Sequence, residues 1–179
     1  MKILKINLEN PDEEILKEAR RILKRGGAVV YPTDTLYGLG VNALSDISLR
    51  KLFQIKKRPF NKPIPIMVRD LEMAKKLAFI DRKTERVLNL VWPGAVTVVL
   101  EKKSIVPDIL TASQSTVGLR IPDCLISQLL IKNLDFPITC TSANLSGQEP
   151  LFCGQEIFEV FQKQSVKPDL ILEAGCLSK

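Results

Sequence analysis

The 179-residue sequence contains no histidine. Without imidazole, the chain can build neither a Ser-His-Asp or Cys-His nucleophile system nor a zinc site with histidine ligands. It also lacks the one side chain whose ordinary pKa lies near 7. Any chemistry that the chain performs therefore depends on other groups.

Long apolar segments are missing as well. The longest run without a charged residue, 87–100, is interrupted by Pro93-Gly94 and is too short to span a bilayer. The N-terminal sequence MKILKINLENPDEE has no apolar signal core and turns acidic by Glu9. We therefore expect a cytoplasmic protein with no membrane contact.

Cysteines are few, and their spacing forms no metal or redox motif. The four cysteines stand at positions 124, 140, 153 and 176, and no two of them form a CxxC pair. Scattered single cysteines in a chain of this size are usually small, buried apolar residues of a protein in a reducing compartment. We expect these four to follow that rule.

What the chain does contain fits one globular domain spanning residues 1–179, since 45% of the residues are hydrophobic and 26% are charged. Lys and Arg number 26 against 20 Asp and Glu, which gives a net charge of +6. Much of this excess is local, because the segment 50–62 has no acid and carries six cations: Arg50, Lys51, Lys56, Lys57, Arg58 and Lys62. A local basic excess points to a polyanionic ligand, either a nucleotide or a nucleic acid.

Hydrophobic periodicity and turn residues divide the chain into alternating helices and strands. The pattern predicts helices over 11–25, 45–58, 70–77, 81–91, 123–132 and 155–163, and strands over 28–31, 64–68, 96–101, 116–120, 137–140 and 170–172. This irregular alternation predicts an α/β fold, a single domain with a twisted, mixed open sheet flanked by helices.

Three segments that follow predicted strands are rich in polar and small residues: 31–40, 116–122 and 139–147. Ligands of open α/β sheets bind where strands end, so the three segments are expected to meet at one site. Each segment alone is better explained as an ordinary turn, because Ser, Thr, Asn, Gly and Pro are the residues that turns require.

The basic segment 56–63 is more specific. Pro59 and Pro63 stiffen it into an extended loop that would present Lys56, Arg58 and Lys62 to a triphosphate. A solvated basic face is the alternative interpretation. The phosphate-binding patterns GxxxxGK[ST] and GxGxxG do not occur, so a nucleotide would be held by cations and turn amides.

Five motifs occur in order along nearly the whole chain, from about 16 to 172: YPTDTLYGLG at 31–40, KKRPFNKP at 56–63, WPGAVT at 92–97, VGLRIP at 117–122 and TSANLSG at 141–147. Together they closely resemble the YrdC-like threonylcarbamoyl-AMP synthases in a short, single-domain form. The resemblance implies a twisted α/β sheet with a basic concave face. It also implies an enzyme that joins L-threonine, bicarbonate or CO2, and ATP into threonylcarbamoyl-AMP and pyrophosphate. A separate tRNA-modifying transferase complex would use the product to make threonylcarbamoyladenosine in tRNA.

The same resemblance implies roles for individual residues. Threonine would be bound by Thr35, Met67, Arg120 and Cys140. ATP would be bound by Arg58, Lys62, Thr116, Ser142 and Asn144, and the catalytic cations would be Lys56, Arg58 and Lys62. Met67 stands where some members have a histidine and can offer only packing. Mg2+ would enter with ATP, and no metal site on the protein itself is expected.

Two other functions remain open at this stage. The basic segment 50–62 could serve a non-catalytic RNA-binding module, and direct RNA contact is also possible for the enzyme. A carbamoyl-transfer relative is a third possibility, since similar domains occur inside larger carbamoylation enzymes. Pyrophosphate release from ATP that requires L-threonine would separate the three.

Overall fold

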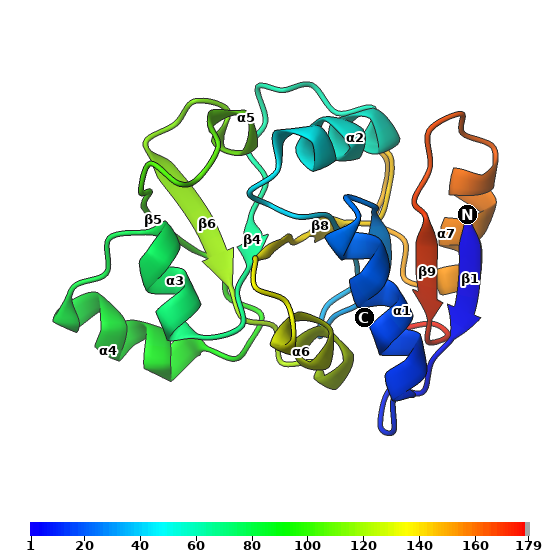
Figure 1. Ribbon diagram of the computed structural model, residues 1–179, viewed down its shortest axis with the longest axis horizontal. Coiled ribbons are helices and arrows are strands. Elements are labelled where there is room, and N and C mark those ends of the chain that lie inside the picture. Colours follow the sequence, from blue (N-terminus) through cyan, green and yellow to red (C-terminus); the bar gives the residue numbers. More distant parts are fainter. Residues whose placement is uncertain (178–179) are drawn as a thin grey trace.

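The computed structural model describes residues 1–177 and contains two hydrogen-bonded sheets, which lie side by side (Figure 1). The strands are β1 (Lys2–Lys5), β2 (Val29–Pro32), β3 (Tyr37–Gly40), β4 (Ile66–Met67), β5 (Val98–Glu101), β6 (Thr116–Arg120), β7 (Ile138–Thr139), β8 (Thr141–Ser142) and β9 (Leu170–Glu173). One sheet has the order β1-β9-β2-β3-β8, and the other has the order β5-β6-β4-β7. Both sheets mix parallel and antiparallel pairs.

Seven helices pack around these sheets in the described chain: α1 (Glu13–Lys24), α2 (Asp46–Lys56), α3 (Leu71–Leu77), α4 (Arg82–Val91), α5 (Asp108–Thr111), α6 (Leu125–Lys132) and α7 (Gly154–Gln162). The predicted α/β class with a mixed open architecture is confirmed. The hydrogen-bond pattern divides it into two ladders instead of one, and only Cys140 separates β7 in one ladder from β8 in the other. The segment 138–142 therefore joins the two sheets.

Helix ends follow from local chemistry. Asp12 caps α1 by accepting a hydrogen bond from the Glu14 backbone N–H at 2.8 Å, and Gly26 follows the helix with a φ of +80°. Ser45 caps α2, as its position in the sequence predicts, and the helix ends before Pro59.

Strand β3 lies in a segment that the sequence suggests is a polar turn. Tyr37–Gly40 is instead fully buried and pairs antiparallel with β2. Its glycines let it pack against the ring of Tyr31, because a Cβ atom would lie 2.9 Å from that ring at Gly38 and 2.8 Å at Gly40. The two glycines weaken the strand pattern in the sequence, yet they are the residues that close packing against Tyr31 requires.

Two cysteines depart from the sequence expectation. Cys153 and Cys176 form a disulfide, whereas Cys124 and Cys140 are unpaired and partly buried. The two bonded residues are 23 positions apart and become neighbours through an isolated antiparallel bridge just after β9. Sequence spacing does not reveal a proximity that folding alone creates. Within residues 1–177, no helix is long and apolar enough to cross a membrane.

Candidate functional site

The three polar segments that follow strands meet at one hollow of about 190 Å³. The first segment contributes Thr33, Thr35, Leu36 and Gly38, the second contributes Arg120, and the third contributes Cys140, Thr141 and Ser142. The predicted convergence is confirmed. Of the residues expected from the sequence, the hollow brings together Thr35, Arg120, Cys140 and Ser142.

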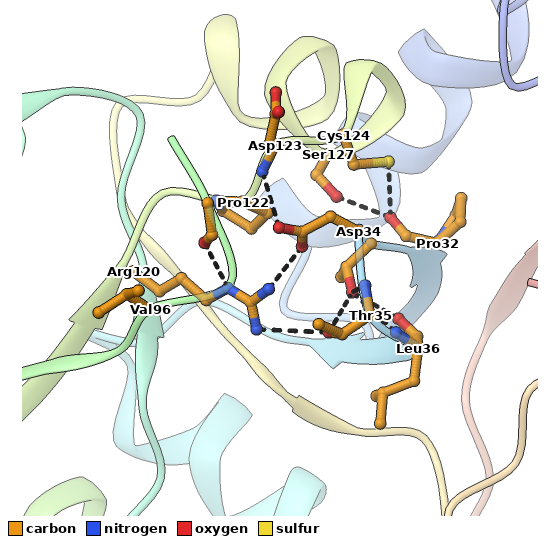
Figure 2. Close-up of polar contacts among 12 residues, drawn as sticks. Pro32, Asp34, Thr35, Leu36, Val96, Arg120, Pro122, Asp123, Cys124 and Ser127 are labelled. Atoms are coloured by element: carbon orange, nitrogen blue, oxygen red, sulfur yellow. Dashed lines mark hydrogen bonds and ion pairs between the residues drawn. The ribbon is translucent and has the colours of Figure 1, made fainter. Parts of the chain in front are cut away.

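Arg120, at the end of β6, is held from three directions (Figure 2). Its Nε donates to the Gly94 carbonyl at 3.1 Å, its Nη2 lies 2.5 Å from Asp34 Oδ1, and its Nη1 lies 3.4 Å from Thr35 Oγ1. A guanidinium carries five N–H groups, and these contacts use three of them. The side chain can therefore bind a further acceptor, such as a carboxylate, without losing its present partners.

Asp34 is a site residue whose role the sequence does not reveal. The side chains of Arg120 and Asp34 are only 11% and 13% exposed, so water screens their ion pair weakly. The other oxygen of Asp34, Oδ2, accepts a hydrogen bond from the Asp123 backbone N–H at 3.1 Å, next to the start of α6 (Figure 2). The only signal in the sequence is that opposite charges occur in two of the converging segments.

The turn after β2 is shaped by Thr33. Its Oγ1 donates to the Leu36 carbonyl at 2.6 Å and accepts the Thr35 backbone N–H at 3.2 Å. This local network holds Thr35 so that its hydroxyl oxygen lies between Thr33 Oγ1, at 3.1 Å, and the guanidinium of Arg120. A hydroxyl and a guanidinium thus face the same hollow.

Of Cys140 and Met67, both expected at the threonine site, only Cys140 lines the hollow. The backbone N–H of Cys140 donates to the Pro65 carbonyl at 2.8 Å, and burial raises the pKa of its thiol. Met67 is fully buried and pairs with Arg120 across the β4–β6 ladder, where β7 covers its other edge. The structure therefore gives Met67 a packing position and does not bring it into the hollow.

The expectation that the basic loop presents Lys56 is wrong. Lys56 is the last residue of α2, is 1% exposed and lies on the helix face that also buries Leu49, Leu52 and Phe53. Its Nζ donates to the Ser142 carbonyl, to the Asn144 carbonyl at 2.8 Å and to Asn144 Oδ1 at 3.2 Å. Lys56 belongs to the buried face of the helix and not to the loop that follows, and this directs the ammonium inward.

Asn144 is likewise satisfied inside the protein. Its Oδ1 accepts from Lys56 and from the Ser142 hydroxyl, the latter at 2.6 Å, and its Nδ2 donates to the Gln148 carbonyl at 2.6 Å. Only 7% of Asn144 is exposed. Asn144 was expected to contact ATP. Its side chain instead forms hydrogen bonds inside the protein and stabilises the turn.

Arg58 and Lys62 match the loop prediction better. Arg58 is half-buried and donates to the Lys62 carbonyl at 3.3 Å and the Pro63 carbonyl at 2.9 Å, while Lys62 is exposed. Burial and then the nearby charge of Arg58 lower the pKa of Lys56 to about 7. Burial also lowers the pKa of Arg58. The positive charges that face solvent are thus those of the loop, not that of the helix end.

Thr116 lines a second hollow of about 180 Å³, together with Pro63, Pro65 and Gly118. Thr116, Gly118 and Arg120 alternate along β6 on its more open face, while Val117 and Leu119 are buried. With a rise of about 3.3 Å per residue, Thr116 and Arg120 stand about 13 Å apart along the strand. Arg120 thus lines one hollow and Thr116 the other along the same face of β6, whereas Arg58 and Lys62 line neither hollow.

Within residues 1–177, no cluster of His, Cys, Asp and Glu is suited to holding a metal ion. The two hollows are lined by hydroxyls, turn backbone and the guanidinium of Arg120. Such a set favours the binding of anions and of a small zwitterion with a carboxylate.

The chain is similar to a known protein family and to several known proteins. The Sua5/YciO/YrdC family model, described as telomere recombination, matches residues 21–179. A putative threonylcarbamoyl-AMP synthase of Methanocaldococcus jannaschii is 36% identical over 177 residues, which cover 97% of this chain and 81% of that protein.

Two solved structures are similar over almost all of the chain. One is Sua5 of Pyrococcus abyssi complexed with L-threonine, with a TM-score of 0.91, 32% identity and coverage of 98% of this chain. This chain spans 51% of that longer protein. The other is YciO of Escherichia coli, with a TM-score of 0.88, 30% identity and coverage of 99% of this chain and 86% of that one.

Proposed function

Because the chain belongs to the Sua5/YciO/YrdC family, we propose that it is an L-threonylcarbamoyl-AMP synthase. The reaction joins L-threonine, bicarbonate or CO2, and ATP, and it releases pyrophosphate. The observation that carries the proposal is the hollow in which Thr35 and Arg120 face each other, since it offers a guanidinium for a carboxylate and a hydroxyl beside it. The similar Pyrococcus abyssi Sua5 was solved with L-threonine.

In the proposed mechanism the nucleophile comes from the substrate. The threonine amine adds CO2 and loses a proton to form a carbamate, and a carbamate oxygen attacks the α-phosphorus of ATP while pyrophosphate leaves. Arg120 holds the carboxylate, and Asp34 keeps the guanidinium aligned for this contact. The protein needs neither a nucleophile nor a histidine base, because positioning and charge neutralisation supply the catalysis.

The nucleotide would lie toward the other hollow. Arg58 and Lys62 would neutralise the phosphates, and Thr116 and Ser142 would bound the nucleotide on two sides. Mg2+ would enter as the Mg–ATP complex and offset part of the charge on the leaving pyrophosphate. The product would pass to a tRNA-modifying transferase, and a cytoplasmic location is part of the same proposal.

The site favours this function over a non-catalytic RNA-binding module. An RNA-binding surface would require exposed cations along a broad face, but it would not require a hollow with a guanidinium fixed by a carboxylate and a hydroxyl. The family relatives named as threonylcarbamoyl-AMP synthases support the same choice.

Pyrophosphate release tests the proposal directly. The protein is incubated with ATP, Mg2+ and bicarbonate, and pyrophosphate is measured with and without L-threonine, with D-threonine as the stereochemical control. We expect release only with L-threonine, together with formation of threonylcarbamoyl-AMP. Release that is independent of threonine, or no release at all, would reject the assignment.

A further inference from the structure

One side chain near the site, that of Lys56, has all of its donors engaged within the protein, although the sequence places it among the phosphate-binding cations. An ammonium has three N–H groups, and all three N–H groups of Lys56 have an oxygen within hydrogen-bond distance: the Ser142 carbonyl, the Asn144 carbonyl and Asn144 Oδ1. The side chain is 1% exposed. Its donors are therefore used within the protein before any ligand binds.

The backbone of Lys56 makes a fourth bond to the same turn. Its carbonyl accepts the Ser146 backbone N–H at 2.8 Å. Asn144 then extends the connection along the turn, because its Nδ2 donates to the Gln148 carbonyl. One residue at the end of α2 thus holds the segment 142–148 at several points.

The end of α2 is itself firmly placed. The backbone N–H of Arg58 donates to the Phe53 carbonyl at 3.0 Å, and that of Lys57 donates to the Gln54 carbonyl at 3.2 Å. For Lys56 to contact a phosphate, it would have to break at least one of its hydrogen bonds and leave a buried carbonyl without a donor, which is costly. Lys62 is exposed, and Arg58 is only half-buried with acceptors in an exposed loop, so contact with a phosphate costs these two side chains less.

We propose that Lys56 is a positioning residue, whose buried ammonium fixes the segment 142–148 so that Ser142 lines the hollow, and that it makes no direct contact with ATP. The link to ATP rests on the proposed function, whereas the structural link between Lys56 and the turn does not. Loss of the ammonium removes its hydrogen bonds to the Ser142 and Asn144 carbonyls and to Asn144 Oδ1, which keeps only the Ser142 hydroxyl as a donor, and so loosens the turn. Loss of Arg58 or Lys62 removes charge and leaves the turn in place.

Amide hydrogen exchange of the ligand-free protein tests the structural link. In the wild type, the Ser146 amide should be protected. In Lys56→Met, exchange at Ser146 should be at least about 10-fold faster, while amides of the central strand β2 stay within about 2-fold. The matched control is Lys62→Met, which makes the same change at an exposed lysine and should leave Ser146 unchanged. An unprotected Ser146 amide in the wild type, or unchanged exchange in Lys56→Met, overturns the proposal.

Nucleotide binding separates positioning from contact. With threonine and bicarbonate omitted, Lys56→Met should lower the affinities for ATP and for AMP by the same factor, whereas Lys62→Met should lower that for ATP much more than that for AMP. A selective loss of ATP affinity in Lys56→Met would indicate direct contact with the outer phosphates and would overturn the proposal. The exchange result needs no nucleotide, so failure of the proposed function would be recognised separately.

A second variant guards against poor folding of Lys56→Met. Asn144→Ala removes one of the three acceptors of Lys56, together with the bonds of Asn144 to the Ser142 hydroxyl and the Gln148 carbonyl, and leaves the lysine in place. If Lys56 acts through the turn, Asn144→Ala should also accelerate exchange at Ser146 and lower ATP and AMP affinity together. Unchanged exchange in this variant would count against the proposal as strongly as in the first.

Discussion

The two ends of the site are built in different ways. At the Arg120 end, the functional guanidinium is held by Gly94, Thr35 and Asp34, and it is almost completely shielded from water. At the loop end, Arg58 is held only by carbonyl groups of its own loop, and Lys62 is exposed. One end is thus held by contacts between separate segments of the chain, while the other is held only within its own loop.

This difference suits the two substrates. A small amino acid offers few contacts, so its orientation depends on groups that are already fixed, and fixed groups lose little entropy on binding. A triphosphate carries several charges and can be bound by exposed cations with less demand on their exact geometry. Changes at the Arg120 end should therefore alter threonine binding, and changes at the loop end should alter nucleotide use in a salt-dependent way.

The largest effect is expected for Arg120→Ala. Loss of a charge-assisted, weakly screened contact with the threonine carboxylate should raise the threonine KM about 100-fold, which corresponds to about 2.7 kcal/mol. The ATP KM should change by less than about 3-fold. Steady-state pyrophosphate release at varied threonine measures this. An unchanged threonine KM would remove Arg120 from the carboxylate role.

Substitutions at the loop end should alter the use of ATP. Arg58→Ala and Lys62→Ala should each lower threonine-dependent pyrophosphate release at subsaturating ATP by at least about 10-fold, or about 1.4 kcal/mol. For Lys62→Ala the deficit should shrink as salt rises, because the charge is exposed and screened in the wild type. Lys57→Ala, at a neighbouring exposed position, is the control and should stay close to wild type. Wild-type rates in both loop variants would contradict the phosphate assignment.

Much of the fold was predictable because its signals are local. The caps of α1 and α2, at Asp12 and Ser45, and the alternation of β6 are visible in short stretches of sequence. Strand β3 was not predictable, since its glycines are required by the ring of Tyr31 from another strand. The Cys153–Cys176 disulfide was missed for the same reason, as only the folded chain brings the two residues together.

The candidate site, like the fold, was only partly predictable from the sequence. That Thr35, Arg120 and Ser142 would meet could be predicted, because each follows a strand and strand ends tend to gather. The residues that pair with the charged side chains could not be predicted. Whether Lys56 points outward or inward depends on whether it belongs to the helix or to the loop, and the pairing of Asp34 with Arg120 joins segments 86 positions apart.

Asp34→Asn tests whether the Arg120 end depends on its carboxylate. The amide keeps the size of the side chain and an oxygen for the Asp123 N–H, but it removes the charge that faces the guanidinium. We expect the threonine KM to rise about 5-fold, or about 1 kcal/mol, with kcat nearly unchanged, because Arg120 remains present but is less well aligned.

Asp34→Ala is the companion variant, since it also removes the contact with Asp123. It should raise the threonine KM further than Asp34→Asn does. If neither variant alters the threonine KM, the ion pair only stabilises the fold and the Arg120 end is not organised by it.

The smallest effect concerns Lys56, which connects the two ends. Burial and the charge of Arg58 lower its pKa from the usual 10.5 to about 7 in the folded protein. Between pH 6.0 and 7.5 the unfolded chain keeps this proton while the folded chain begins to release it. The unfolded state then binds more protons, so stability rises with pH. Relative to Lys56→Met, which has no such group, the wild type should gain less than about 1 kcal/mol in unfolding free energy over this range.

Urea unfolding of both proteins at pH 6.0, 6.75 and 7.5 measures this difference, with Lys62→Met as the control for loss of an exposed lysine. A difference between wild type and Lys56→Met that does not change with pH would mean that the proton stays on Lys56 throughout. The three oxygens of Ser142 and Asn144 would then outweigh burial. In that case Lys56 stays charged at every pH in this range and holds the turn throughout. The loop end would then be fixed in advance at Lys56, as the Arg120 end is, although its other cations are exposed.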